Sequence, residues 1–159
     1  MNTAADPTLL SLCDEVRQKT LRRLEDVTEE QARFVPDGLQ NSILWHAGHA
    51  FVVTEWLTMG AIGAEPTCPD GWFEMFSWMS NPADTPDDAW PTLNEVVEQL
   101  RIQHGRLHGA IQNIPAERLD QYANDDATVS VRFRIMHGFH DEACHSGEIW
   151  LLRKMQGAS

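Results

Sequence analysis

Apolar residues recur every three or four positions in four separate stretches of the chain. The stretches run from about Pro7 to Asp26, from Asn41 or Ser42 to about Met59, from Thr92 to the residue before Pro115, and from Thr128 or Ser130 to Gly157. This spacing is typical of amphipathic helices, and no strand-like alternation extends beyond a few residues. The pattern predicts an all-α fold, a four-helix bundle.

The expected helix ends carry residues that cap helices well. Asn41 or Ser42 can begin the second helix, and Thr92 with Glu95 has the spacing of a capping box at the start of the third. Within the helices, Arg17 falls on the polar side of the first, and Glu55 points away from the apolar stripe of the second. We therefore assign both charged residues to the polar sides of their helices.

The connection between the second and third helices, residues 60–91, is rich in Gly, Pro and Asp and has no sustained periodicity. A connection of this length in a compact domain is either a functional lid or a disordered segment. Its central part, Trp72–Met79, is too aromatic for a free linker. We expect a long crossover loop in which Trp72–Met79 folds back as a short helical turn and covers part of the bundle.

Composition narrows the classes of protein to consider. The chain has 159 residues, 42% of them hydrophobic, which suits one domain (residues 1–159) with a substantial core. A formal net charge of −12 argues against a nucleic-acid partner, because phosphate backbones would be repelled. No apolar run is long enough to span a membrane and the N-terminus shows no signal pattern, so we expect a cytoplasmic protein without a membrane partner. The three cysteines are too widely spaced for a disulfide framework or a zinc knuckle: Cys13, Cys68 and Cys144.

Histidines stand among apolar residues in the second and third helices. His49 lies inside the apolar stripe of the second helix, between Trp45 and Trp56, and His46 lies on the shoulder of the same face. Taken alone, His49 fits a hydrogen-bonded core histidine better than a metal ligand, and only a pair of potential ligands on another helix changes this interpretation. For His46, and for His104 and His108 in the third helix, a snorkelling or outer-shell role is favoured over metal ligation.

The fourth helix carries the densest group of titratable residues. At about 100° per residue, His137, Asp141 and His145 stack on successive turns, with Glu148 and Cys144 close beside them. Asp141 and His145 place an oxygen and a nitrogen on adjacent turns, near enough to bind one cation. His140 and His145 are about 140° apart on a regular helix and would share a metal only across a π-bulge.

A competing interpretation turns this titratable face to water. An apolar face made of Ile135, Met136, Phe139, Ala143 and Trp150 lies roughly opposite and would then pack inward. The titratable stripe, however, continues into Leu151, Leu152 and Met155. A helix that is apolar on two sides is expected to be buried on two sides, one in the bundle and the other against a second subunit.

Two segments resemble helix signatures of the DinB/YfiT-like metalloprotein superfamily. The second-helix signature is matched by Asn41-Ser-Ile-Leu-Trp-His-Ala-Gly-His49, followed by Trp56. The fourth-helix signature is matched by His137-Gly-Phe-His-Asp-Glu-Ala-Cys-His-Ser-Gly-Glu-Ile-Trp-Leu-Leu152. With the helix count and lengths between them, the resemblance covers nearly the whole chain.

The resemblance implies a four-helix bundle, often dimeric, that holds a divalent metal (Zn, Ni or Fe) between the second and fourth helices. Many members use a His-x-x-x-His pair on the fourth helix. This chain has Asp141 before His145, like relatives such as the mycothiol-dependent maleylpyruvate isomerase, which use a carboxylate. Carried over by position, the metal ligands are His49, Asp141 and His145. The remaining titratable residues become outer-shell or alternative ligands: His46, His137, His140 and Glu148.

Three functional hypotheses follow. The first is a metal-dependent enzyme acting on a small molecule, either a transferase or isomerase that uses a low-molecular-weight thiol, or a hydrolase. The second is a non-catalytic metal-binding or stress-response homodimer whose metal is fully enclosed by protein ligands. The third is an interaction dimer without metal, in which the second apolar face of the fourth helix matters most.

Overall fold

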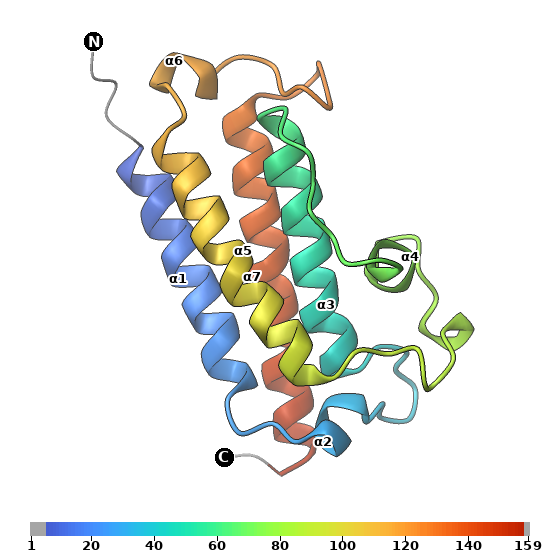
Figure 1. Cartoon of the computed structure of the whole chain (residues 1–159). Helices are drawn as coiled ribbons and strands as arrows, with labels where there is room; N and C mark the ends of the chain where they lie inside the picture. Colours follow the sequence, from blue (N-terminus) through green and yellow to red (C-terminus); the bar gives the residue numbers. More distant parts are fainter. Residues whose placement is uncertain (1–5, 158–159) are drawn as a thin grey trace.

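The computed structural model describes residues 6–157, and four long helices form its body. They are α1 (Pro7–Leu24), α3 (Ile43–Thr54), α5 (Leu93–Gln112) and α7 (Val131–Met155), and α3 is prolonged by a π-helical segment, η1 (Glu55–Met59). The four lie side by side in one bundle (Figure 1). The all-α four-helix architecture predicted from the apolar pattern is confirmed.

The chain direction explains why a long crossover is needed. In Figure 1, α1 and α7 run in one direction, whereas α3 and α5 both run in the other. Residues 60–91 therefore return the chain along the outside of the bundle before α5 begins. Four short elements complete the fold: α2 (Glu29–Arg33), α4 (Trp72–Phe76), η2 (Pro82–Asp84) and α6 (Ala116–Leu119).

Side-chain caps fix the starts of the helices, as the sequence predicted. Ser42 accepts from the Trp45 backbone N–H, and Thr92 and Glu95 form the full capping box at α5. Of the two candidates for the start of α7, Ser130 is the cap, and it accepts from Phe133 N. Satisfied backbone donors at these ends fix the residue at which each helix begins.

Every residue of α3 is buried, from Ile43 to Thr54. The helix packs against α5 and α7, and its outer side is covered by α4 from the crossover. Trp72 and Phe76 of α4 are themselves buried in the same apolar cluster. The predicted aromatic turn therefore exists and covers the helix that carries His49, which explains why α3 is apolar all round.

A buried polar network crosses the core and corrects two of the sequence expectations. Arg17 is only 2% exposed and Glu55 is 0% exposed, so neither lies on a solvated side. The guanidinium of Arg17 donates to both carboxylate oxygens of Glu142, at 2.8 and 2.9 Å. Gln103 accepts from Arg17 at 2.7 Å and donates to Glu55 at 2.8 Å, so the network joins all four long helices. Burying these charges is tolerated because each has a partner.

The apolar face predicted for α7 is only partly correct. Ile135 and Phe139 are buried, but Met136 is 47% exposed and Ala143 is also exposed. The inward face instead includes small and polar residues, Gly138, Glu142 and Ser146, because the core on this side contains the polar network and the close approach of α3 and η1. Hydropathy alone therefore misplaced the inward face by part of a turn.

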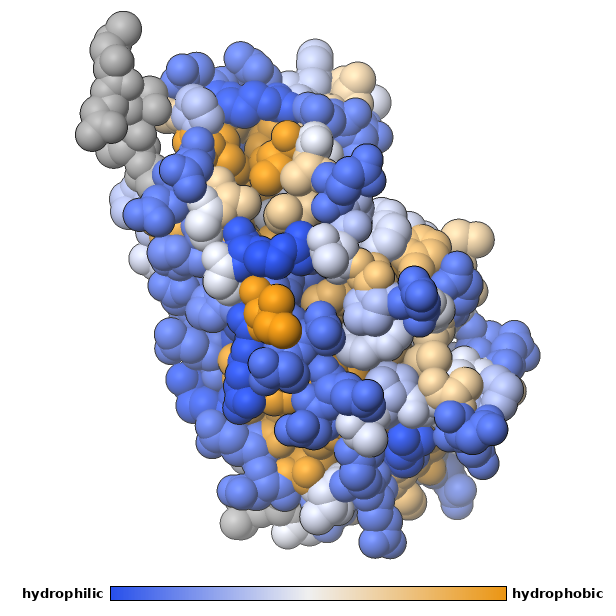
Figure 2. Space-filling model, viewed as in Figure 1, coloured by the Kyte–Doolittle hydropathy of each residue, from blue (hydrophilic) through white to orange (hydrophobic). Residues whose placement is uncertain are grey.

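The outer surface is largely hydrophilic on the side shown in Figure 2, with smaller apolar areas between the polar ones. Among residues 6–157, no helix combines the length and the apolar character that a membrane span requires.

Candidate metal centre

Two long helices bring three predicted residues together. His49 comes from the middle of α3, and Asp141 and His145 come from adjacent turns of α7. One donor atom of each residue lies within 4.8 Å of a donor atom of the other two. Helix α7 is regular throughout, so the pair that shares this cluster is the i, i+4 pair and not His140 with His145.

One oxygen of Asp141 lies at the centre of the cluster. Its Oδ2 atom is 3.6 Å from His49 Nε2 and 3.7 Å from His145 Nε2. Both separations are too long for a hydrogen bond, and Oδ2 is buried without a hydrogen-bond partner among residues 6–157. A buried, unpartnered carboxylate oxygen is costly unless a cation or a proton compensates it.

The crossover determines which nitrogen of His49 is free. His49 Nδ1 lies 2.6 Å from the carbonyl oxygen of Phe76 in α4. A carbonyl only accepts, so Nδ1 carries the proton and Nε2 presents a lone pair towards Asp141. The imidazole is also stacked on Trp45, with ring centroids 4.6 Å apart, and Trp45 Nε1 donates to Ser80 of the crossover at 3.1 Å. Ring position and tautomer are thus both fixed.

His46 supports the third residue. Its Nδ1 lies 2.8 Å from Nδ1 of His145, so one imidazole donates to the other. When His145 is the donor, its Nε2 keeps a lone pair directed at Asp141. His46 therefore contacts the cluster through His145.

Burial keeps the three imidazoles neutral. Burial, together with the nearby His145 and His49, lowers the pKa of His46 to about 3. Burial and His49 lower the pKa of His145 to about 4, although Asp141 opposes the change. Burial also lowers the pKa of His49, against the opposing effects of the Phe76 carbonyl and Asp141. Neutral imidazoles are the form that binds metal ions.

The other sequence candidates lie outside the cluster. His137, His140 and Glu148 are all exposed. His137 stacks on Phe133, with ring centroids 5.8 Å apart, and His140 Nε2 lies 3.9 Å from the sulfur of Cys144. The predicted stack of His137 with Asp141 and His145 therefore does not produce one site, because His137 lies two helical turns from His145 and its exposed ring is stacked on Phe133.

A cavity of about 390 Å³ adjoins the cluster. Its walls combine the cluster, aromatic and aliphatic side chains, and an ion pair between Arg134 and Asp125: His49, Asp141, His137, Val53, Trp56, Leu57, Trp78, Asp125 and Arg134. This volume suits a small organic molecule. A pocket with both apolar and polar walls that opens on His49 and Asp141 gives the cluster access to a ligand.

The DinB superfamily profile matches residues 12–149, a range that includes every residue of the cluster. The chain belongs to the DinB superfamily. A comparison with curated proteins gave no significant match.

This DinB-superfamily chain also resembles a solved structure, that of a conserved protein from Enterococcus faecalis. The two share 19% sequence identity, the TM-score is 0.69, and the match covers 92% of this chain and 94% of the other. At this level of identity, the likeness concerns the fold alone.

Sequence reasoning missed several residues around the cluster of His49, Asp141 and His145. The Phe76 carbonyl is a backbone group, which no side-chain pattern identifies. Asp125 and Arg134 enter the cavity from the connection before α7 and from its first turns, and their 3.2 Å ion pair could not be recognised from spacing. The one available signal was the aromatic richness of Trp72–Met79, which indicated that this segment covers something.

Proposed function

We propose that this DinB-superfamily chain is a divalent-metal-dependent enzyme whose metal is held by His49, Asp141 and His145. Its reaction is a transfer or isomerisation that uses a low-molecular-weight thiol, or a hydrolysis. The observation that carries the proposal is the buried Oδ2 atom of Asp141, which lacks a hydrogen-bond donor within the described part of the chain, residues 6–157, and faces two imidazole nitrogens.

The proton inventory of the cluster favours a cation. His49 Nδ1 carries a proton, so its Nε2 lone pair faces a carboxylate oxygen that also has only lone pairs. Two acceptors facing each other repel, and the lowered pKa of each imidazole argues against a proton between them. A divalent ion would satisfy both acceptors and His145 Nε2 as well.

The donor set also limits the choice of ion. Two imidazoles and one carboxylate suit Zn²⁺, Ni²⁺ or Fe²⁺ better than Mg²⁺ or Ca²⁺, which prefer oxygen ligands. With three protein donors, coordination positions remain for a substrate or a thiol. A metal bound there would supply Lewis-acid chemistry, polarising a carbonyl or favouring the ionised form of a thiol.

The surrounding residues would orient a substrate and keep its reactive end out of bulk water. Trp56 and Trp78 provide aromatic walls for an apolar or planar group. Arg134 is held by Asp125 at 3.2 Å and Asp126 at 3.3 Å, so its charge is largely compensated. The cavity thus favours a small molecule with an apolar body over a highly charged one.

Elemental analysis of protein purified without chelators tests the proposal. His145→Ala should lower the bound metal by about one equivalent per chain while the protein stays helical. His140→Ala is a matched control, because His140 is an exposed imidazole on the same helix. Equal metal content in wild type and His145→Ala would overturn the assignment. A screen of the metal-loaded protein with bacterial thiols and model electrophiles then separates transfer from hydrolysis.

A closed, non-catalytic metal site is the second candidate, and it requires a fourth protein ligand. His46 is the nearest candidate, but its Nδ1 faces Nδ1 of His145 and not Asp141. X-ray absorption on the zinc protein would distinguish the two, because a third imidazole as fourth ligand favours the closed site and a light oxygen ligand in that position favours the open one.

We also propose that the protein is a homodimer that associates through α7. The outer side of this helix carries a stripe of large apolar residues, each about half exposed: Phe133 at 52%, Met136 at 47%, Leu151 at 49% and Met155 at 54%. Two pairs of large exposed apolar residues, one near each end of the same helix, are candidates for burial against a partner. The second apolar side noted in the sequence supports the same proposal.

A further inference from the structure

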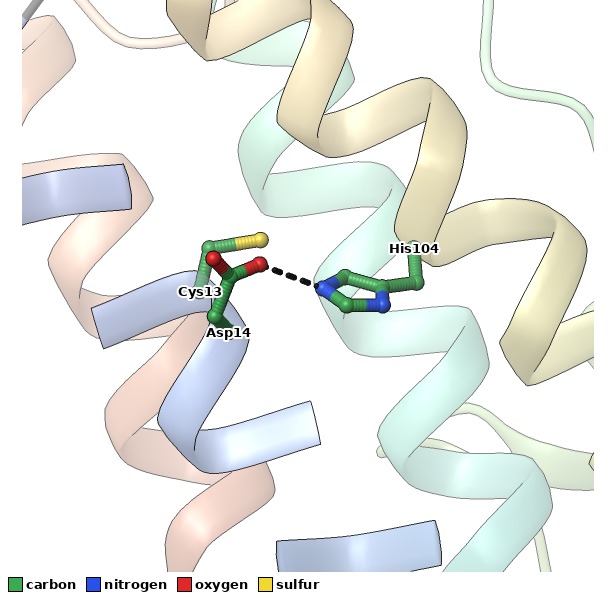
Figure 3. Close-up of side chains that lie close together, drawn as sticks. All are labelled: Cys13, Asp14 and His104. Atoms are coloured by element: carbon green, nitrogen blue, oxygen red, sulfur yellow. Dashed lines mark hydrogen bonds and ion pairs between the residues drawn. The ribbon is translucent and has the colours of Figure 1, made fainter. Parts of the chain in front are cut away.

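A second group of potential metal ligands lies on α1 and α5, the two long helices that do not carry the cluster of His49, Asp141 and His145. Cys13 and Asp14 of α1 meet His104 of α5, and one donor atom of each residue lies within 4.8 Å of the others. Figure 3 shows the three side chains converging at the seam between the two helices, with the Cys13 sulfur beside the Asp14 carboxylate and the His104 ring opposite.

We propose that Cys13, Asp14 and His104 form a second divalent transition-metal site, with His108 as an additional donor. His104 and His108 occupy adjacent turns of α5 and both direct Nε2 at the same carboxylate. His104 Nε2 lies 2.8 Å from Asp14 Oδ1, and His108 Nε2 lies 3.7 Å from Asp14 Oδ2. Two helices thus supply one sulfur, one carboxylate and two imidazoles to one region.

The spacing requires only small movements to accommodate an ion. Nitrogen, oxygen and sulfur ligands lie about 2.0–2.3 Å from zinc, so neighbouring donors of a tetrahedral site are roughly 3.3–3.8 Å apart. The donors of Cys13, Asp14 and His104 are mutually within 4.8 Å. An ion would therefore need the 2.8 Å contact between His104 Nε2 and Asp14 Oδ1 to lengthen, and both side chains are partly exposed and have room to rotate.

The chemistry of the donors favours Zn²⁺, Co²⁺ or Ni²⁺. A cysteine sulfur with imidazoles and one carboxylate is a mixed soft and borderline set, which Mg²⁺ and Ca²⁺ do not select. Cys13 is 1% exposed and would close the inner side of the site. Side chains of Asp14 and His108 are 40% and 38% exposed, which gives an ion a path from solvent.

The site shares no residue with the cluster of His49, Asp141 and His145, which lies between α3 and α7. An ion at the α1–α5 seam would connect two helices that are already adjacent. Its expected effect is therefore stabilisation of the folded chain on metal binding, independent of the first site.

Zinc titration of metal-stripped full-length protein tests the inference in the His145→Ala background, where the first site is disabled. This protein should bind about one Zn²⁺ and melt at a higher temperature when loaded. Adding His104→Ala should weaken that binding at least about 10-fold. Adding His140→Ala, an exposed imidazole elsewhere, should leave it unchanged. Asp14→Asn, which keeps the side-chain shape, provides a second variant if His104→Ala does not fold.

The absorption spectrum of bound Co²⁺ tests whether the sulfur of Cys13 is a ligand. Co²⁺ bound to the His145→Ala protein should show a thiolate charge-transfer band that Cys13→Ser removes and Cys144→Ser retains. No zinc binding to His145→Ala protein, or equal binding after His104→Ala, would overturn the second site. If instead the proposed site of His49, Asp141 and His145 is wrong, wild type and His145→Ala will bind the same amount of zinc. His104→Ala will still reduce the amount of zinc bound.

Discussion

Asp141 Oδ2 lies 3.6 Å from His49 Nε2, and this pair joins α7 to α3 across the interior of the bundle. The oxygen is buried and has no hydrogen-bond donor within residues 6–157. Two acceptors in contact destabilise the metal-free protein and create a place for a cation. The arrangement that favours cation binding at Asp141 therefore lowers the stability of the metal-free protein.

Asp141→Asn should show this opposition directly. The amide can donate to His49 Nε2, so the metal-free variant should be more stable than wild type by about 1 kcal/mol. Metal affinity should fall at least about 10-fold, because a charged ligand is lost. Urea unfolding with chelator and zinc titration measure the two effects. Glu148→Gln, an exposed charge change on the same helix, should alter neither. A metal-free variant less stable than wild type would contradict the argument.

Gly48→Ala should disturb the site through the crossover. A Cβ at Gly48 would lie 2.4 Å from the buried Phe76 ring, so α4 must shift away from α3. The variant should lose about 1–3 kcal/mol of stability and bind metal more weakly, because the Phe76 carbonyl orients His49. Gly147→Ala is the control: nothing lies within 4 Å of its Cβ, and it should stabilise α7 by roughly 0.5–1 kcal/mol. Unfolding and zinc titration of both variants test this.

Arg17→Met should be among the most destabilising single changes. It leaves Glu142, which is 0% exposed, without its charged partner, at an expected cost of about 3–5 kcal/mol. Adding Glu142→Leu removes the unpaired charge and should recover much of the loss. Urea unfolding of the single and double variants measures the recovery. A double variant as unstable as the sum of the two single variants would show that the pair is not coupled.

Acid should destabilise the metal-free protein before its carboxylates are fully protonated. The pKa of His46 is lowered to about 3 and that of His145 to about 4, against about 6.5 in the unfolded chain. Between about pH 6.5 and pH 4 the unfolded chain binds more protons, so the free energy of unfolding falls as pH falls. His46→Gln should reduce this loss by at least about 1 kcal/mol, and His137→Gln, at an exposed position, should not. The free energy of unfolding is measured against pH by urea unfolding, and the same pH dependence in wild type and His46→Gln would contradict the interpretation.

Leu151→Lys should weaken the proposed dimer. Leu151 is 49% exposed on the outer side of α7, and a charge there would oppose burial against a second copy. Ile102→Lys is the matched control, because Ile102 is equally exposed, at 49%, but lies on α5. Sedimentation velocity should show a shift towards monomer only for Leu151→Lys. A wild type that remains monomeric at high concentration would remove the proposal.

The helices and their caps were predictable because their signals are local. Ser42, Thr92 and Ser130 cap backbone groups a few residues away, and the apolar period needs only one helix to be visible. The Asp141–His145 half of the cluster was predictable for the same reason, since one helical turn fixes its geometry.

Long-range polar contacts were not predictable in the same way. Arg17 and Glu55 look like surface residues in their own helices, and only partners distant in sequence, Glu142 and Gln103, allow their burial. The convergence of Cys13 and Asp14 with His104 likewise depends on how α1 packs against α5.

The sequence by itself determined the four helices, their order and the residues able to bind a cation, because helix periodicity and side-chain chemistry act over a few residues. Tertiary structure decided which of those residues meet. His137 faces solvent, whereas the Phe76 carbonyl, a group without any sequence signature, fixes the tautomer of His49. Packing of distant segments decides burial, and burial decides which lone pairs are left for a metal.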